Sequence, residues 1–136
     1  MKAWKWMRKL GGTADHRRVI GRKGERRAAR YLRRRRYRIL HRNLTIAKDE
    51  ADLVALDPDG CTIVIVEVKT RRSGHVAPEA NISREKRYRL ARLAAKLQRM
   101  KSYAGRPFRF DVVTIIWPEG GRPEVKHYAG AFESPF

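Results

Sequence analysis

The sequence predicts an α/β fold in which a mixed central sheet is flanked by helices. Two long segments, at about 17–36 and 83–102, repeat apolar residues at helical spacing. Around them lie four or five shorter runs of the apolar and β-branched residues that favour strands. The order is helix, three strands, helix, then one or two strands, and 136 residues suffice for one domain with a buried core.

The first predicted helix carries an acid on its apolar stripe. Ala28, Ala29 and Leu32 define this stripe, and Glu25 lies one turn before them on the same side. Glu25 and Asp15 are the only acids among the first 48 residues. Glu25 is therefore either a surface glutamate paired with arginine or an inward-facing member of a site.

Three strands are expected next, at 38–44, 51–56 and 61–70. Between the second and the third, the sequence Asp-Pro-Asp-Gly at 57–60 is a strong turn signal. These two strands should therefore form a hairpin.

The third strand ends in two opposite charges. It reads Ile-Val-Ile-Val-Glu-Val-Lys over 63–69, so Glu67 and Lys69 have the spacing that places two side chains on one face of a strand. Such charges are costly unless they are paired, hydrogen-bonded or bound to a metal. The two residues are therefore either an ion pair at a strand end or part of a divalent-metal site that carries a lysine.

Asp52 is expected on the same face. With a four-residue loop at 57–60, Leu56 pairs with Cys61, and counting back along the hairpin places Asp52 opposite Ile65. Asp52 would then be diagonal to Glu67, about 7–8 Å away at the backbone. A slip of one residue would turn Asp52 to the other face.

Two further acids precede Asp52. The same register sets Glu50 opposite Glu67, unless Glu50 turns away at the start of the strand. We expect both Asp49 and Glu50 to face solvent.

The remaining elements follow a loop at 72–81 that is rich in Gly, Ser and Pro. The second helix should pack through one apolar face, made of Leu90, Leu93, Ala94, Leu97 and Met100. A fourth strand is expected at 108–117, and 122–128 is a candidate for a fifth.

Charge indicates the class of partner. The formal net charge of +19 predicts an anionic polymer, most simply nucleic acid, with an affinity that falls as salt rises. No segment approaches the roughly 20 apolar residues of a spanning helix. We expect a single domain at 17–130, a basic flexible extension at 1–16 and a tail at 131–136. Trp4 and Trp6 of the extension either belong to an unstructured tail or contact bases or a lipid surface.

Cysteine and histidine usage excludes two other kinds of site. Cys61 is the only cysteine, so an intrachain disulfide is excluded and a reducing cytoplasm fits. The four histidines have no paired spacing, which argues against zinc: His16, His41, His75 and His127.

The acids and the lysine predict the chemistry of a metal-dependent nuclease. Asp52 and Glu67 offer the carboxylate oxygens that Mg²⁺ and Mn²⁺ select, and the Val68 backbone carbonyl would add a ligand. Lys69 would orient or help to deprotonate a coordinated water, or stabilise charge on the phosphate. Glu25 would hold a metal-bound water or a second ion.

Several motifs resemble, in order and spacing, those of the YraN family of small bacterial proteins. They are Gly24-Glu25, Arg42-Asn43, Ala-Asp-Leu-Val-Ala at 51–55, Glu-Val-Lys-Thr-Arg at 67–71 and Arg-Phe-Asp-Val-Val at 109–113. The similarity covers about 19–117. It implies a restriction-endonuclease-like fold within the PD-(D/E)xK superfamily, which includes archaeal Holliday-junction resolvases.

The resemblance also implies roles for particular residues. Asp52 and Glu67 would be metal ligands, Lys69 the catalytic lysine, and Glu25 the helix-borne acid of resolvase-like members. Asp111 matches a family position, where we expect a structural cap or pair rather than catalysis. Thr70 and Arg71 would lie at the phosphate-contacting edge, so the expected nucleic-acid contacts are Arg22, Lys23, Arg26, Thr70, Arg71 and Arg72.

The chain departs from the family pattern in two places. It reads Asp49-Glu50 where the family usually has Gly-Glu before the aspartate. Arg36-Tyr37 stands where the family often turns on glycine after the first helix. The first change bears on the hairpin register, and neither removes an expected catalytic group.

Two functional classes fit these observations. The first is a Mg²⁺- or Mn²⁺-dependent DNA endonuclease, acting on branched or damaged DNA in recombination or repair, and dimeric by analogy with resolvases. The second is a non-catalytic basic protein that binds RNA or the ribosome. The acids favour the enzyme, because a protein that only binds a polyanion needs none. A membrane-surface protein is a distant third reading.

Overall fold

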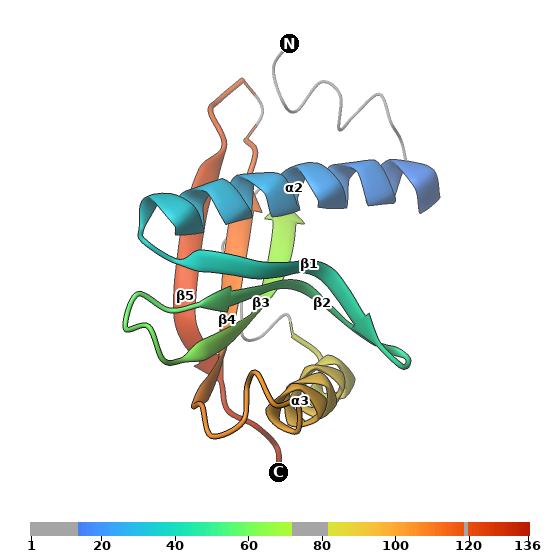
Figure 1. Cartoon of the computed structure of the whole chain (residues 1–136). Coiled ribbons are helices and arrows are strands. Elements are labelled where there is room, and N and C mark those ends of the chain that lie inside the picture. Colours follow the sequence, from blue (N-terminus) through green and yellow to red (C-terminus); the bar gives the residue numbers. More distant parts are fainter. Residues whose placement is uncertain (1–13, 72–81, 119) are drawn as a thin grey trace.

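A computed structural model describes residues 14–71, 82–118 and 120–136, with side chains from residue 21 onward. In these ranges the chain forms two helices and five strands (Figure 1). Their order is α2 (Ala14–Arg34), β1 (Arg38–Ile46), β2 (Asp49–Leu56), β3 (Ile63–Arg71), α3 (Arg84–Gln98), β4 (Phe108–Ile116) and β5 (Glu124–Phe132). The predicted α/β class is confirmed, and two strands follow the second helix.

The five strands form one mixed sheet in the order β1-β2-β3-β4-β5. Every neighbouring pair is antiparallel except β3 and β4, which are parallel and are joined through α3. This architecture is compatible with that of the restriction endonucleases.

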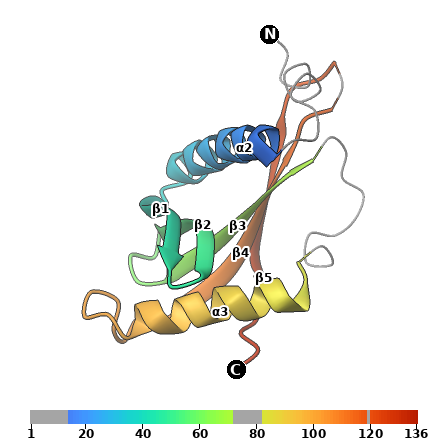
Figure 2. The same cartoon turned by 90° about the vertical axis from the view of Figure 1, so that its right-hand side faces the viewer.

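The two helices cover opposite faces of the sheet, as Figure 2 shows. The predicted stripe of Ala28, Ala29 and Leu32 on α2 is fully buried and packs on the face that carries Val64 and Val66. The apolar side of α3 packs on the other face, formed among others by Ile63, Ile65, Val54, Phe110 and Val112. Both faces of β3 are therefore buried, which explains its continuous apolar run.

The end of α2 turns without glycine. Arg36 adopts a left-handed backbone with φ of 70°, and the Tyr37 amide donates to the Leu32 carbonyl at 3.0 Å. This is the hydrogen bond of a Schellman motif, a helix end at which glycine is usual because it has no Cβ.

The second helix is shorter than predicted. Ser83 caps its start by accepting a hydrogen bond from the Lys86 amide, and Arg99 caps its end. Met100 therefore lies beyond the helix and is 43% exposed, so its predicted place on the apolar face is wrong.

The predicted hairpin register is also wrong, by two residues. Leu56 pairs with Ile63 rather than with Cys61. The reason lies in the loop, where the Asp59 carboxylate accepts hydrogen bonds from the amides of Cys61 and Thr62. These bonds hold both residues in the turn. An even shift preserves which face each side chain occupies, so the side expected for Asp52 is kept.

Asp49 was expected to face solvent, and this prediction is wrong. It is fully buried at the start of β2 and accepts two hydrogen bonds from the Arg92 guanidinium, with Lys96 3.6 Å away. Both cations come from α3, so Asp49 ties the β1–β2 hairpin to that helix. Glu50 is exposed as expected, and it does not pair with Glu67, because the pairing of β2 with β3 ends at Leu53 and Val66.

Some expectations concern residues outside this description. They are the basic extension with Trp4 and Trp6, the side chain of His16, and the segment at 72–81 with Arg72 and His75. Among the described residues, no helix is long and apolar enough to span a bilayer.

Candidate active site

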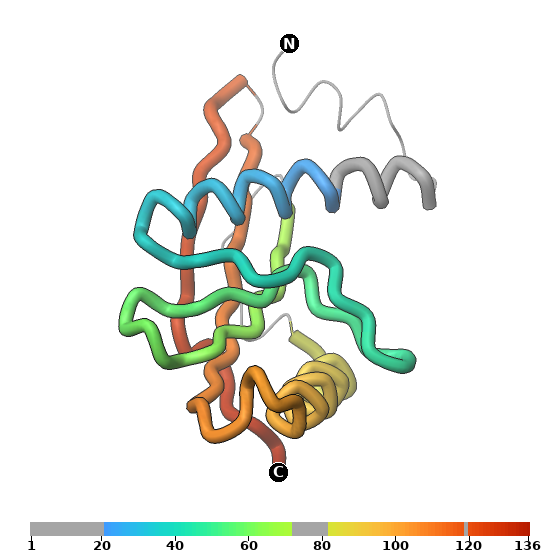
Figure 3. Tube along the Cα trace, viewed as in Figure 1, coloured from blue at the N-terminus to red at the C-terminus, as the bar shows by residue number. Residues whose placement is uncertain are grey.

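The candidate site lies where β2 and β3 diverge. Their last paired residues are Leu53 and Val66, after which the β1–β2 hairpin bends away from β3 (Figures 1 and 3). Asp52 is the first β2 residue beyond this pair, and its carboxylate accepts a hydrogen bond from the Val68 amide at 2.8 Å. A side chain thus continues the contact between the two strands where their backbones separate.

Three predicted acids meet at this point. The carboxyl groups of Glu67 of β3 and Glu25 of α2 both lie beside the Asp52 carboxyl, which raises the pKa of each. Glu67 is only 5% exposed, and Glu25 is half-buried with the Asn43 side chain next to it. The inward position expected for Glu25 is therefore observed, and the helix and both strands contribute to one carboxylate cluster, defined as Glu25, Asp52 and Glu67.

The cluster holds its protons tightly. Burial, and then the neighbouring Asp52 carboxyl, raise the pKa of Glu67 to about 8. The same two causes raise the pKa of Glu25 to about 7, although the neighbouring Asn43 side chain opposes the shift. Carboxyl groups this close repel one another when ionised, so a cation placed among them would stabilise their charged forms.

Two lysines face Glu67. The Lys86 ammonium of α3 lies 3.6 Å from the Glu67 carboxylate, and both Lys86 and Lys69 lower the pKa of Glu67 against the effect of burial. Sequence reasoning missed Lys86. A signal was available in the sequence, because Lys86 lies in the first turn of a helix. The macrodipole disfavours a lysine there, so an acidic partner nearby is expected.

Two carboxylates and a backbone carbonyl at this point are groups that could hold a hydrated divalent cation. In a strand, the amide and carbonyl of one residue point to the same side, so the Val68 carbonyl faces the edge where Asp52 lies. Among the described residues, no group of three His, Cys, Asp or Glu side chains is arranged to hold a metal ion by itself. Mg²⁺ is commonly held by one or two carboxylates with several waters, and Asp52 and Glu67 provide this.

Asn43 is a second residue that sequence reasoning missed. Its side chain lowers the pKa of the neighbouring Glu25, and its backbone is left-handed with φ of 50° inside β1. Asparagine tolerates this conformation better than most residues. The signal was its place in the Arg42-Asn43 motif.

The expected nucleic-acid contacts fall into two groups. Arg22, Lys23 and Arg26 are exposed on α2 around Glu25, and Arg71 is exposed at the end of β3. Thr70 differs, because it faces α2 instead of the side that carries Lys69. A Cβ added to Gly24 would lie 2.2 Å from the Thr70 hydroxyl oxygen. Arg72 is outside the described residues.

Asp111 has the structural pairing that was expected for it. It is fully buried and accepts hydrogen bonds from the Arg109 guanidinium and the Gly130 amide, and it also pairs with His127. Arg109 in turn donates to Tyr37, just after α2. These partners lower the pKa of Asp111 against the effect of its burial. The network joins β4 and β5 to the end of α2.

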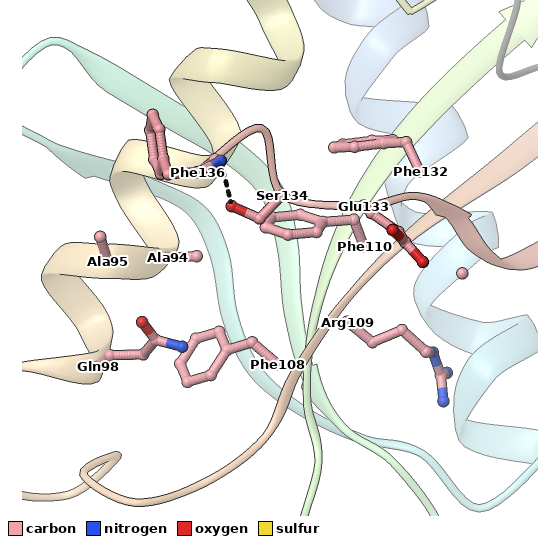
Figure 4. Close-up of a pocket in the computed structure, with 12 residues that line it drawn as sticks. Ala94, Ala95, Gln98, Phe108, Arg109, Phe110, Phe132, Glu133, Ser134 and Phe136 are labelled. Carbon is pink, nitrogen blue, oxygen red and sulfur yellow. Dashed lines mark hydrogen bonds between the residues drawn. The ribbon is translucent and has the colours of Figure 1, made fainter.

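A separate pocket, lined by both apolar and polar side chains, lies between α3 and the ends of β4 and β5. Figure 4 shows its aromatic lining, in which Phe110 stacks on Phe132, while Arg109 points away. Its volume is about 660 Å³, and none of the predicted site residues lines it. The candidate site is therefore the carboxylate cluster.

Comparison with known proteins gives consistent matches over most of the chain. Residues 24–115 match the family model described as "Uncharacterised protein family UPF0102". A UPF0102 protein of Geobacter metallireducens is 41% identical over 123 residues, covering 87% of this chain and 95% of that protein. A UPF0102 protein of Pelotomaculum thermopropionicum is 38% identical over 120 residues, covering 88% and 99%. One of Renibacterium salmoninarum is 40% identical over 114 residues, covering 82% and 93%.

Proposed function

The chain belongs to the uncharacterised protein family UPF0102, which is the YraN family inferred from its motifs, and from this premise we propose that it is a metal-dependent DNA endonuclease. One observation carries the proposal. In a chain of net charge +19, the carboxyls of Glu25, Asp52 and Glu67 gather beside Lys69 and Lys86. A protein that only binds a polyanion gains nothing from acids in this position.

Mg²⁺ or Mn²⁺ is the cofactor that this cluster would take. When bound, such an ion neutralises phosphate charge and lowers the pKa of a coordinated water. Asp52 and Glu67 would hold it, with the Val68 carbonyl as a further ligand. Since the pKa of Glu67 is raised to about 8, its carboxyl would release a proton on becoming a ligand.

The neighbouring side chains act on the substrate and on water. Lys69 shares the strand face of Glu67, so its ammonium would donate hydrogen bonds to the scissile phosphate and stabilise the charge that develops there. Glu25 reaches the cluster from α2 and would orient a water at its edge. Arg22, Arg26 and Arg71 would bind flanking phosphates.

A non-catalytic role in binding RNA or the ribosome is the second candidate. The exposed arginines of α2 favour it as much as they favour the enzyme. The buried acids distinguish the two, because burial makes them costly and only the enzyme uses them.

The test is cleavage of labelled DNA with Mg²⁺, Mn²⁺ or EDTA. The substrates are duplex, single-stranded, flap and four-way-junction DNA, and the last two examine the expected preference for branches. We expect cutting by the wild type to be lost in Asp52→Ala and in Lys69→Ala while DNA binding persists. Glu133→Ala, an exposed acid outside the cluster, should cut normally. Equal cutting by all four proteins, or no cutting of any substrate, would refute the proposal.

A further inference from the structure

A row of polar side chains crosses the sheet next to the carboxylate cluster. Lys69 of β3 pairs with Thr114 of β4, and Thr114 pairs with Lys126 of β5. Directly paired residues share a face, so these three side chains line up on the face that carries Glu67. Figure 2 shows the three strands running side by side. Neighbouring strands are about 4.8 Å apart, which sets Lys69 and Lys126 about 10 Å apart at the backbone.

Thr114, in the middle of the row, is buried without a hydrogen-bond partner. Thr114 is 7% exposed, and its hydroxyl has no hydrogen-bond partner in the described part of the chain. The other residues of 112–116 are Val and Ile, so the hydroxyl interrupts an apolar stretch. A buried hydroxyl without a partner is destabilising, which indicates a ligand that completes its hydrogen bonding.

Lys126 supplies an accessible cation at the other end of the row. Its side chain is 45% exposed, and its ammonium lies 3.9 Å from the carboxylate of Glu124, two residues away. Exposed ion pairs of this kind contribute little. Breaking this ion pair therefore costs little free energy when the Lys126 ammonium binds another anion.

We propose that Lys69, Thr114 and Lys126 form a phosphate-binding row, in which Lys69 contacts the scissile phosphate and Thr114 and Lys126 hold the phosphodiester next to it. Two ammonium groups and a hydroxyl are donors suited to phosphate oxygens. Because the row starts at Lys69, the DNA strand would run from the carboxylate cluster across β4 to β5. This inference rests on the proposed nuclease function and adds the direction of the substrate strand.

The first test measures binding of a short DNA duplex in EDTA, by fluorescence anisotropy over a series of salt concentrations. Each phosphate contact contributes about 0.9 to the slope of log affinity against log salt. We expect Lys126→Met to lower this slope by about 0.9. Lys101→Met is the matched control, because Lys101 is exposed in the turn after α3 and lies outside the row.

The second test separates binding from folding. Thr114→Val removes the hydroxyl and keeps the shape of the side chain. We expect its DNA affinity to fall about ten-fold with an unchanged salt slope, because a hydrogen bond to a charged phosphate is lost. Its free energy of unfolding should stay equal or rise, because an unsatisfied buried hydroxyl is removed.

The outcomes distinguish this inference from the function on which it rests. Two outcomes would refute the proposed phosphate-binding row. One is an equal salt slope for Lys126→Met and Lys101→Met, and the other is a Thr114→Val protein that loses stability together with DNA affinity. In that case, metal-dependent cutting by the wild type would still support the nuclease. A wild type that neither binds nor cuts DNA would overturn both.

Discussion

Lys86 lies 3.6 Å from Glu67, so α3 places a cation against the most deeply buried acid of the carboxylate cluster. The lysine belongs to the first turn of α3, which begins at the Ser83 cap. Its charge lowers the pKa of Glu67 and thereby offsets part of the cost of burying that carboxyl. Lys86 thus neutralises part of the negative charge that would attract a divalent cation to Glu67.

Removing the Lys86 charge should strengthen metal binding. In Lys86→Met the carboxylates lose a competing cation, and because Lys86 is 32% exposed the effect is limited to about 1 kcal/mol, or roughly five-fold. Titration of the protein with Mn²⁺, followed by electron paramagnetic resonance, measures it. Lys96→Met is the control, since Lys96 pairs with Asp49 outside the cluster. Equal or weaker binding by Lys86→Met would contradict the competition.

The cluster should make the metal-free protein less stable as pH rises. The pKa of Glu67 is raised to about 8 in the folded state, against 4.5 as the ordinary value. Between these values the folded state holds more protons than the unfolded state, so folding takes up a proton and rising pH opposes it. The loss is at most about 1.4 kcal/mol per pH unit for one group.

Urea unfolding in EDTA between pH 5 and 8 measures this loss. Glu67→Gln should remove the part due to Glu67, so this variant is more stable than the wild type at pH 8 and similar to it at pH 5. Glu133→Gln, which changes an exposed acid, should keep the slope of the wild type. A Glu67→Gln protein with the slope of the wild type would show that Glu67 is ionised in the folded state at neutral pH.

Glycine should improve the end of α2. Arg36 has a φ of 70°, where a Cβ is unfavourable, and its own amide donates to the Arg33 carbonyl. We expect Arg36→Gly to raise the free energy of unfolding by roughly 1 kcal/mol, measured in urea. Arg30→Gly should lower it by about the same amount, because Arg30 is exposed in the interior of the helix. A loss of stability in Arg36→Gly would mean that the arginine side chain stabilises the turn.

Parity made the site predictable although the register was wrong. Asp52 was placed on the face of Glu67 by counting back from a four-residue loop. The real loop shifts the pairing by two residues, and side chains on a strand alternate with a period of two. The predicted face of Asp52 was therefore correct despite the wrong register. Only the position of Asp52 along the strand changed. It was expected diagonal to Glu67, and it instead accepts a hydrogen bond from the Val68 amide.

Contacts between distant elements were not predictable in the same way. Asp49 was expected in solvent, yet it is buried and Arg92 reaches it from α3. The Lys86 contact with Glu67 depends on the same packing of α3 against the sheet. A helix's apolar face indicates that it packs, but the angle and the height at which it packs decide which charges meet.

Gly24 should control how closely α2 approaches β3. A Cβ at this position would lie 2.2 Å from the Thr70 hydroxyl oxygen, so in Gly24→Ala the Thr70 side chain, the helix or the strand must move, and a shift of the helix carries Glu25 with it. We expect a loss of about 1–3 kcal/mol in stability, together with reduced DNA cutting. Gly21→Ala is the control on the same helix: its Cβ would meet nothing within 4 Å, so it should gain about 1 kcal/mol from helix propensity.

A second substitution identifies the cause of the Gly24→Ala effect. The Thr70 Cβ would lie 3.5 Å from the added methyl, which is an ordinary contact, so Thr70→Ala should restore the stability and cutting of Gly24→Ala. Rescue is expected because the clash involves only the hydroxyl. A double variant as weak as Gly24→Ala would place the constraint in the backbone instead. Full stability of Gly24→Ala alone would show that Thr70 turns aside, and that the position of Glu25 does not depend on this contact.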